Sequence, residues 1–312
     1  MSRPLRIEYP GAFYHITSRG NERKAIFRGN KTCERFLSYF ESATERYGAK
    51  IHCFCLMPNH YHLLLETPRG NLHQILHHLN TSYTNYFNVR TGRVGHLFQG
   101  RYRAILVDKD SYALELSRYI HLNPVRAAMA KEPTDYLWSS YGGYAGERPS
   151  WDWLQTDFIL GQMSASRKEA RRRYSKYVEQ GMATGLKDPL EEVVASTVLG
   201  SESFVEWVKR KWVNGAQVHR DLPAIRKLTD GPEISTILGE VERVFGTDTA
   251  ESRRVALYLC HRLSGLGLGE IGKVFGISAS GVSQNTRRVE ILLEEDATLP
   301  KTIQNISKII RQ

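Results

Sequence analysis

Two histidines separated by one residue, His60 and His62, are the side chains of this sequence best suited by type and spacing to bind a metal ion. They follow the turn-forming pair Pro58 and Asn59 and begin a segment that reads as a strand. Because successive side chains of a strand point to opposite faces, both imidazoles lie on one face and can chelate one divalent cation. The same spacing also fits two surface histidines that bind nothing.

Tyr119 and Asn123 form a second candidate pair, four residues apart in a segment that reads as a helix. Residues at this spacing share one helix face. A phenol can act as a covalent nucleophile, and an amide oxygen can serve as a third metal ligand. Two alternatives stay open. Helical tyrosines are commonly core residues, and Asn123 followed by Pro124 fits a cap and a first-turn proline.

The elements that must position these residues alternate between strand and helix patterns. Strands are expected over residues 12–18, 50–57, 60–66 and within 96–107, and helices over 31–47, 71–89 and 108–130. This order matches the split βαβ, ferredoxin-like arrangement of an α+β domain. We expect an antiparallel sheet with helices on one face, which leaves the other face free for a ligand. An aromatic loop over residues 138–146 is expected to close the domain.

The charge distribution favours a polyanionic partner for the N-terminal part. The net charge is +10, and residues 1–148 hold 20 Lys and Arg against 12 Asp and Glu. Residues 149–189 hold 7 against 5, and residues 190–312 hold 16 against 16. Nucleic acid is the commonest partner of a basic domain, although mild basicity alone is common. A basic helix over 167–181 carries Arg171 and Arg172, which either contact a DNA backbone or form a solvated face.

The C-terminal part is expected to be helical, with helices over 252–263, 268–275 and 279–293 around a tight turn at 276–278. This is a helix-turn-helix pattern. Its small core is expected from Ile271, Val274, Phe275, Ile277, Val282 and Val289. Side chains that hydrogen-bond base edges and phosphates follow the polar side of the third helix: Ser280, Ser283, Gln284, Arg287 and Arg288. An ordinary helical hairpin with a polar face is the alternative.

The domain prediction is a catalytic domain over 1–148, a basic helical extension over 149–189, and a helical domain over 190–312 with its helix-turn-helix at 252–293. No apolar run approaches the roughly 20 residues of a membrane span, and the N-terminus lacks the apolar core of a signal peptide. A cytoplasmic protein with no membrane partner is expected. The four cysteines predict buried, inert thiols; a zinc site at Cys53 and Cys55 is the less favoured alternative.

Several ordered motifs together resemble a known family. They are Arg3–Ile7, Tyr14–Asn21, Cys55–Leu64, Gly95–Tyr102 and Tyr119–Val125. Over roughly residues 3–180 the chain resembles the single-tyrosine transposases of the histidine–hydrophobe–histidine (HUH) endonuclease superfamily, especially the REP-associated tyrosine transposase branch. The middle position of the histidine motif is Tyr61, which is less apolar than the family pattern.

The resemblance implies a ferredoxin-like catalytic domain that cleaves single-stranded or hairpin repeat DNA through a phosphotyrosyl intermediate. Tyr119 would be the nucleophile, His60 and His62 would bind Mg²⁺ or Mn²⁺, and Asn123 would be the third ligand. Arg19, Arg101 and Arg103 are expected to contact the strand, and Tyr61 or Tyr102 to stack on bases. The tail resembles the helix-turn-helix of the bacterial replication initiator, which implies duplex DNA as its partner. A monomer or a homodimer is expected.

Two other function classes remain as alternatives. A DNA-binding regulator with an inactive nuclease domain would need only the helix-turn-helix. A hydrolytic metalloenzyme would need another ligand near His60; Glu66 lies on the same strand face as His62 but roughly 13 Å away by strand rise. The combined presence of His60, His62 and Tyr119 favours the transposase-like enzyme.

Overall fold

The computed structural model describes residues 7–183, 188–213, 232–264, 266, 268–295 and 298–310. Residues 3–6 of the first motif and residues 184–187 near the expected boundary at 189 lie outside the described residues. The chain divides into two compact units, one of residues 6–205 and the other containing residues 206–312. The division into 1–148, 149–189 and 190–312 stays a prediction, and the break between compact units comes later than 189.

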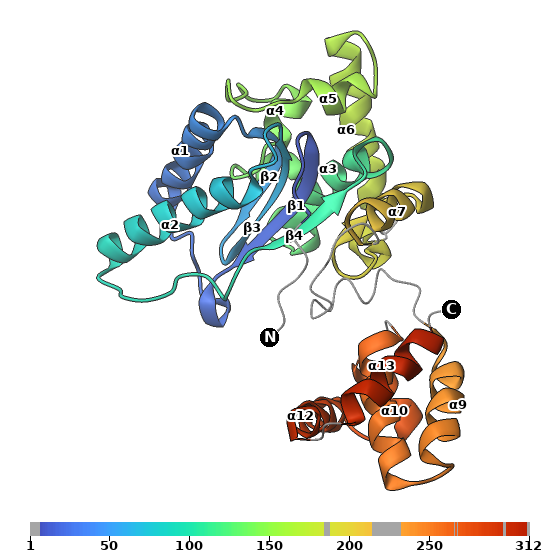
Figure 1. Ribbon diagram of the computed structural model, residues 1–312. Helices are drawn as coiled ribbons and strands as arrows, with labels where there is room; N and C mark the ends of the chain where they lie inside the picture. The colour runs from blue at the N-terminus through green and yellow to red at the C-terminus, as the bar shows by residue number, and fades with distance from the viewer. Residues whose placement is uncertain are drawn as a thin grey trace. The chain divides into compact units, whose positions relative to one another are not determined.

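The first unit is built on one five-stranded sheet with the order β2–β3–β1–β4–β5 (Figure 1). The strands are β1 (Ala12–Arg19), β2 (Lys50–Met57), β3 (His60–Thr67), β4 (Arg103–Val107) and β5 (Val198–Leu199). Neighbours among β1 to β4 are antiparallel, whereas β5 runs parallel to β4. The order of the first four strands confirms the α+β, ferredoxin-like prediction, and the added β5 makes the sheet mixed.

Helices and short turns connect these strands and follow them along the chain. The helices are α1 (Asn30–Tyr47), α2 (Leu72–Thr91), α3 (Lys109–Arg126), α4 (Tyr141–Ala145), α5 (Asp157–Gly161), α6 (Arg167–Ala183) and α7 (Glu202–Val208), and α7 spans the division between the units. The short turns are η1 (Asn21–Arg23), η2 (Pro133–Asp135), η3 (Pro189–Glu192) and η4 (Lys209–Val213). The first three long helices lie close to their expected positions, although α3 ends at Arg126 rather than near 130.

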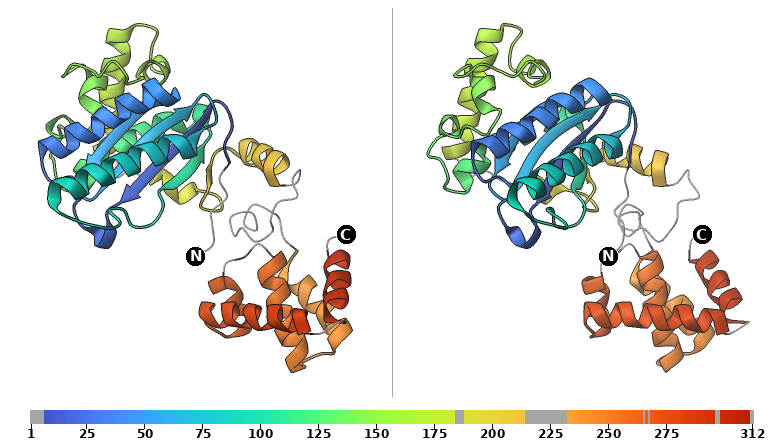
Figure 2. Two further views of the ribbon diagram at one scale, coloured as in Figure 1. Left: turned by 60° about the vertical axis from the view of Figure 1, so that its left-hand side comes forward. Right: turned by 90° about the vertical axis from the view of Figure 1, so that its left-hand side faces the viewer.

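The sheet is covered on both faces, which differs from the expectation of helices on one face only. Figures 1 and 2 show α1 and α2 side by side over one face. Tyr61 points to that face, where its ring lies 4.9 Å from the ring of Phe36. Its neighbour His62 points to the opposite face, where α3 packs against β2 and β3. The strand alternation therefore separates an aromatic core from the face that holds the histidines.

The two sides of the four-stranded antiparallel part of the sheet, along β2 and β4, both have backbone partners. Along β2, the Leu56 amide donates to the carbonyl of Trp138 at 2.8 Å, and the Gln155 amide donates to the carbonyl of Ile51 at 2.8 Å. Along β4, the Leu106 amide donates to the carbonyl of Thr197 at 2.7 Å. The expected aromatic loop at 138–146 thus closes the β2 edge, and part of it forms α4.

A buried histidine joins α3 to its surroundings. The two ring nitrogens of His121 lie 2.7 Å from the Tyr174 hydroxyl on α6 and 2.7 Å from the Ser140 hydroxyl. Ser140 Oγ also accepts the amide of Phe54 on β2 at 2.9 Å. Burial lowers the pKa of His121 to about 3, so the ring is neutral at ordinary pH. The network fixes α3 relative to β2 and therefore fixes the position of Tyr119.

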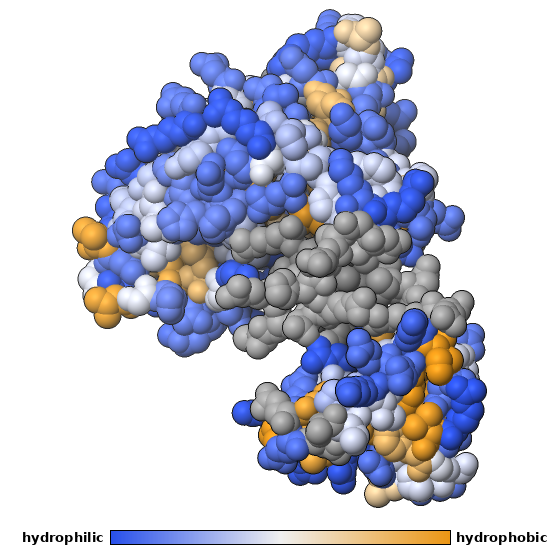
Figure 3. Space-filling view, viewed as in Figure 1, coloured by the Kyte–Doolittle hydropathy of each residue, from blue (hydrophilic) through white to orange (hydrophobic). Residues whose placement is uncertain are grey.

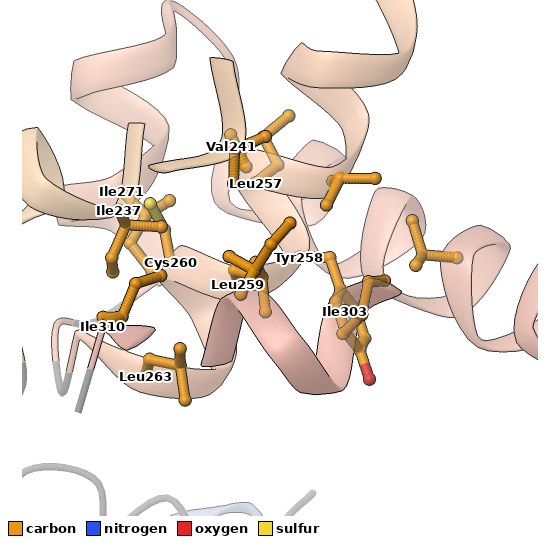
Figure 4. Packing of buried hydrophobic residues seen from close by; sticks show 14 of the residues in the cluster. Ile237, Val241, Leu257, Tyr258, Leu259, Cys260, Leu263, Ile271, Ile303 and Ile310 are labelled. Carbon is orange, nitrogen blue, oxygen red and sulfur yellow. The ribbon is translucent and has the colours of Figure 1, made fainter. Parts of the chain in front are cut away.

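The second unit is an all-α bundle of α9 (Ile234–Phe245), α10 (Ala250–Leu263), α11 (Leu268–Phe275), α12 (Ala279–Glu295) and α13 (Leu299–Ile309). Residues such as Ile271 on α11 and Ile303 on α13 pack around the buried face of α10 (Figure 4). The expected core is correct except at Val274, which is 57% exposed because it lies on the outer face of the short α11.

All four cysteines are buried, as expected for inert thiols. Burial raises the pKa of Cys33 to about 12. In the part of the chain that the structure describes, no helix is long and apolar enough to cross a membrane.

Candidate functional site

The paired histidines lie at the start of β3 and face the same pocket. Their ring centroids are 5.0 Å apart and the rings are inclined at 70°. His62 is buried and His60 is half-buried, which disfavours the alternative of two surface histidines. Both line a pocket of about 520 Å³ on the sheet face opposite α1 and α2.

Tyr119 reaches this pocket from α3. Its ring centroid lies 5.9 Å from that of His62, with the two rings at 75°. The side chain is largely buried, yet it belongs to the pocket wall rather than to the aromatic core under α1 and α2. The structure therefore brings together the predicted nucleophile and both predicted metal ligands, which come from segments far apart in the sequence.

Asn123 does not act as the helix cap that its position before Pro124 suggested. It lies inside α3, which continues through Pro124 to Arg126, so it is not a helix cap. Its amide nitrogen donates to the carbonyl of Tyr119 at 2.9 Å, one turn earlier in the helix. The pocket wall contains His60, His62 and Tyr119 but not Asn123. A ligand role for Asn123 stays a prediction.

The pocket carries the expected cations. Arg19, Arg101 and Arg103 all line it, and all three are exposed. Thr17, Ser18 and Gln99 add neutral hydrogen-bonding groups to the same wall. This set can bind phosphate oxygens along a strand that passes the histidines.

The electrostatics of the pocket keep the imidazoles neutral. Burial and then Arg19 lower the pKa of His60 to about 4. Burial, followed by the neighbouring His15, holds the pKa of His62 well below its usual range. Neutral imidazole is the form that binds a metal, so the two side chains fit a divalent cation. No cluster of three or more His, Cys, Asp or Glu residues suited to a metal occurs among the described residues.

Burial raises the pKa of the Tyr119 phenol, and Asp188 raises it further. Arg126 and Arg103 act in the opposite direction. The Arg126 guanidinium lies 5.0 Å from the centre of the Tyr119 ring and pairs with Asp188 at 3.8 Å. The cations next to the phenol are suited to stabilise negative charge on its oxygen.

Three residues of this site were missed by the sequence reasoning: His15, Arg126 and Asp188. His15 occurs in a quoted motif, but its position opposite the histidine pair depends on the register of β1 against β3. Arg126 shares the helix of Tyr119, which was a usable signal. Asp188 lies on η3, after α6, and no local pattern places that segment on the pocket wall.

One predicted role, the stacking of Tyr61 on a base, is wrong. Tyr61 is fully buried, and its hydroxyl donates to Asn80 Oδ1 at 2.9 Å, so it cannot stack on a base in the pocket. Glu66 binds Lys50 and His52, each at 3.1 Å, and is absent from the pocket wall, in agreement with the sequence argument against it as a metal ligand. Tyr102 is half-buried on the segment that leads into β4.

Arg171 and Arg172 lie elsewhere, in a shallow groove along α6 of about 810 Å³. Lys168 and Lys176 line the same groove, which makes it basic. Arg172 is bound to Glu169 on the same helix at 2.8 Å. These residues are therefore not brought to the pocket of the histidines, and their contact with DNA stays a prediction.

The predicted recognition residues of the second unit all lie on one side of α12. Every member of the set is exposed: Ser280, Ser283, Gln284, Arg287 and Arg288. The turn between α11 and α12 needs glycine twice, since a Cβ at Gly272 would lie 2.5 Å from the Ile277 carbonyl oxygen and Gly276 has a φ of +67°.

Figure 3 shows that the visible described surface is largely hydrophilic, with small apolar areas.

The match to a family model agrees with the resemblance to a transposase family. Residues 9–123 match the family model described as "Transposase IS200 like". A solved REP-associated tyrosine transposase bound to a REP hairpin is 17% identical and has a TM-score of 0.41, covering 50% of this chain and 92% of its own. A putative transposase from Deinococcus radiodurans R1 is 17% identical with a TM-score of 0.28, covering 38% and 95%. No curated protein matches the chain.

Proposed function

We propose that this chain, which matches the IS200-like transposases over residues 9–123, is an endonuclease and strand transferase for single-stranded DNA. Tyr119 is the nucleophile of the proposal, and His60 and His62 hold the divalent cation. The observation that carries it is the convergence of these three side chains on the wall of one basic pocket.

The proposed cation is Mg²⁺ or Mn²⁺. When bound, it offsets the charge that develops on the oxygens of the scissile phosphate. The neutral state of both imidazoles supports this part of the proposal. Mn²⁺ is the thermodynamically better partner of nitrogen ligands, while Mg²⁺ is far more available in cells.

In the proposed reaction, the Tyr119 oxygen attacks the phosphorus and loses its proton. A bond forms between this oxygen and phosphorus, and the bond from phosphorus to the 3′ oxygen breaks. The departing 3′ oxygen takes up a proton and becomes a free hydroxyl. Because the new phosphotyrosyl bond keeps the energy of the phosphodiester, the 3′ hydroxyl of another DNA end can reverse the step and complete strand transfer without ATP.

The remaining cations of the first unit position the strand. Arg19, Arg101 and Arg103 would bind its phosphates, and their exposure on the pocket wall supports this assignment. Arg126 would stabilise the phenolate form of Tyr119, next to which it lies. The exposed face of α12 would bind duplex DNA through a helix-turn-helix.

The test is a denaturing gel of labelled single-stranded DNA hairpins from the flanks of the gene, incubated with Mg²⁺ or Mn²⁺. Wild type should give a covalent protein–DNA band, and Tyr119→Phe should give none while still binding the DNA. Tyr112→Phe is the matched control, because it removes a hydroxyl from the same helix outside the pocket. A covalent band with Tyr119→Phe would refute the nucleophile.

The second candidate function is a DNA-binding regulator. The compact helical unit with its exposed polar face on α12 favours it. If neither wild type nor Tyr119→Phe cleaves any hairpin tested but both bind duplex DNA, the regulator becomes the better interpretation.

A further inference from the structure

His15, on β1, is a buried histidine in direct contact with one of the two candidate ligands. It is 1% exposed, and its Nε2 lies 3.1 Å from Nδ1 of His62 on the adjacent strand β3. The two rings are stacked, with centroids 5.3 Å apart and an angle of 17°. The hydrogen bond thus occupies Nδ1 of His62 and leaves Nε2 available to bind a metal ion.

Asn59 makes the corresponding contact with the second candidate ligand. Its side-chain oxygen lies 2.6 Å from Nδ1 of His60. The amide nitrogen of Asn59 donates to the carbonyl of Arg23 at 3.0 Å, which fixes the orientation of the amide. His60 must therefore donate from Nδ1, so its Nε2 carries a free electron pair. Among the described residues, neither His60 nor His62 uses Nε2 in a hydrogen bond.

We propose that His15 is a positioning residue that accepts the Nδ1 proton of His62 and so presents the Nε2 electron pair of His62 to the metal ion. This inference rests on the metal site of the proposed function. A hydrogen bond in the reverse direction would place the proton on His62 Nε2 and abolish its ability to bind a metal. Metal-binding histidines generally need such an outer partner to fix the tautomer and the ring orientation.

The surroundings of His15 make it the less constrained of the two partners. His15 Nδ1 is buried and has no hydrogen-bond partner among the described residues, whereas Asn59 is held by Arg23. No side chain therefore dictates which nitrogen of His15 carries its proton. In the proposed arrangement this proton lies on His15 Nδ1, so that His15 Nε2 is the acceptor already in the metal-free protein.

The side chain of glutamine offers a discriminating substitution. Its terminal amide reaches the position of Nε2 in histidine and can accept a proton there, while it has no polar atom at the position of Nδ1. His15→Gln should therefore keep the hydrogen bond to His62, and His15→Leu should remove it. His52→Leu is the matched control, because His52 is equally buried in the same sheet but lies outside the pocket.

The first measurement is the affinity of the full chain for Mn²⁺ in the absence of DNA, determined by isothermal titration calorimetry. His15→Leu should weaken Mn²⁺ binding by about 10- to 100-fold, the range for losing an outer partner of a ligand. His15→Gln should stay within about threefold of wild type, and folded His52→Leu should match wild type. Normal affinity in His15→Leu overturns the proposal, and so does equal weakening by Gln and Leu.

Nitrogen NMR of the histidine rings in the metal-free protein is the second measurement. Wild type and His15→Gln should show His62 protonated on Nδ1, and His15→Leu should lose this preference. A wild-type His62 protonated on Nε2 overturns the proposal. A wild type that binds no Mn²⁺ overturns both the metal site and its positioning by His15. A wild type that binds Mn²⁺ through His62 but forms no covalent DNA adduct refutes only the proposed cleavage.

Discussion

The ring of Tyr119 lies across that of His62, with centroids 5.9 Å apart and planes at 75°. One ring is carried by a helix and the other by a strand, and α3 packs directly against β3. The reacting groups of the proposed site are thus held by two regular elements rather than by loops. Rigid elements of this kind hold catalytic geometry more accurately.

Removing either candidate ligand should remove metal dependence and cleavage together. We expect His60→Ala and His62→Ala each to lower cleavage by more than about 100-fold, beyond the cost of losing only an outer partner of a ligand. The measurement is the rate of hairpin cleavage against Mn²⁺ concentration. His77→Ala, an exposed histidine of α2, is the control. An unchanged metal response in both variants would dismiss the site.

The arginines of the pocket should contribute to binding through phosphate contacts. Arg19→Gln and Arg103→Gln should each weaken binding of single-stranded DNA and reduce the salt dependence of log K by about 0.7. Fluorescence anisotropy at several salt concentrations gives this slope. Arg90→Gln should change neither quantity, since Arg90 is exposed on α2 and absent from the pocket wall. Equal slopes in all proteins would mean that the strand does not follow these residues.

The helix-turn-helix should act independently of cleavage. Replacing Arg287 and Arg288 by Ala should weaken binding to duplex DNA by at least about tenfold, because each provides a charged contact from α12. Cleavage of short single-stranded hairpins should stay at the wild-type rate. Arg243→Ala on α9 is the matched control, since Arg243 is paired with Glu240 at 2.8 Å. Loss of hairpin cleavage in the α12 variant would contradict this separation.

The turn of the helix-turn-helix should be sensitive to one methyl group. Gly272→Ala should destabilise the second unit by roughly 1–3 kcal/mol, because its Cβ would meet the Ile277 carbonyl oxygen at 2.5 Å. A Cβ at Gly269 on the same helix would meet nothing within 4 Å. Gly269→Ala should therefore stabilise the second unit, by at most about 1 kcal/mol. Thermal circular dichroism reports both changes, and equal effects of the two substitutions would contradict the contact.

Buried His121 should make the first unit less stable in mild acid. Its pKa is about 3 in the folded protein against an ordinary value of 6.5, so the unfolded chain binds the proton first. The stabilisation is complete above pH 6.5 and is lost as the pH falls toward 3, at up to about 1.4 kcal/mol per pH unit. His121→Gln should therefore show a shallower pH dependence of its unfolding free energy.

Urea denaturation followed by tryptophan fluorescence between pH 7 and 5 measures this slope. Helices α9 to α13 contain no tryptophan, and three of the five tryptophans, Trp138, Trp151 and Trp153, lie within residues 6–205, so the signal reports mainly on the first unit. His15, His60 and His62 contribute slopes of the same sign in both proteins, since burial lowers the pKa of each. Identical slopes in wild type and His121→Gln would show that His121 is not the responsible group.

Local periodicity was enough to predict much of this molecule. The strand alternation placed His60 and His62 on one face, whereas the expectation that Tyr119 joins them came from the family resemblance, because the helical spacing only paired Tyr119 with Asn123. Contacts between distant segments were not predictable in this way. The approach of His15 to His62 depends on strand register, and the approach of Asp188 to Tyr119 depends on where η3 folds back. Val274 was misplaced because a two-turn helix has too few residues to define its buried side.

The backbone partners on the outer sides of β2 and β4 restrict how two copies of this chain can associate. An open edge strand offers amides and carbonyls to a strand of another molecule. Here β5 occupies the outer side of β4, and residues 138–155 occupy the outer side of β2. Another copy can therefore pair a strand directly with β2 or β4 only after one of these segments is displaced. An association that leaves both segments in place must instead be built from side chains on the helical faces, and can form without unfolding any part of the sheet.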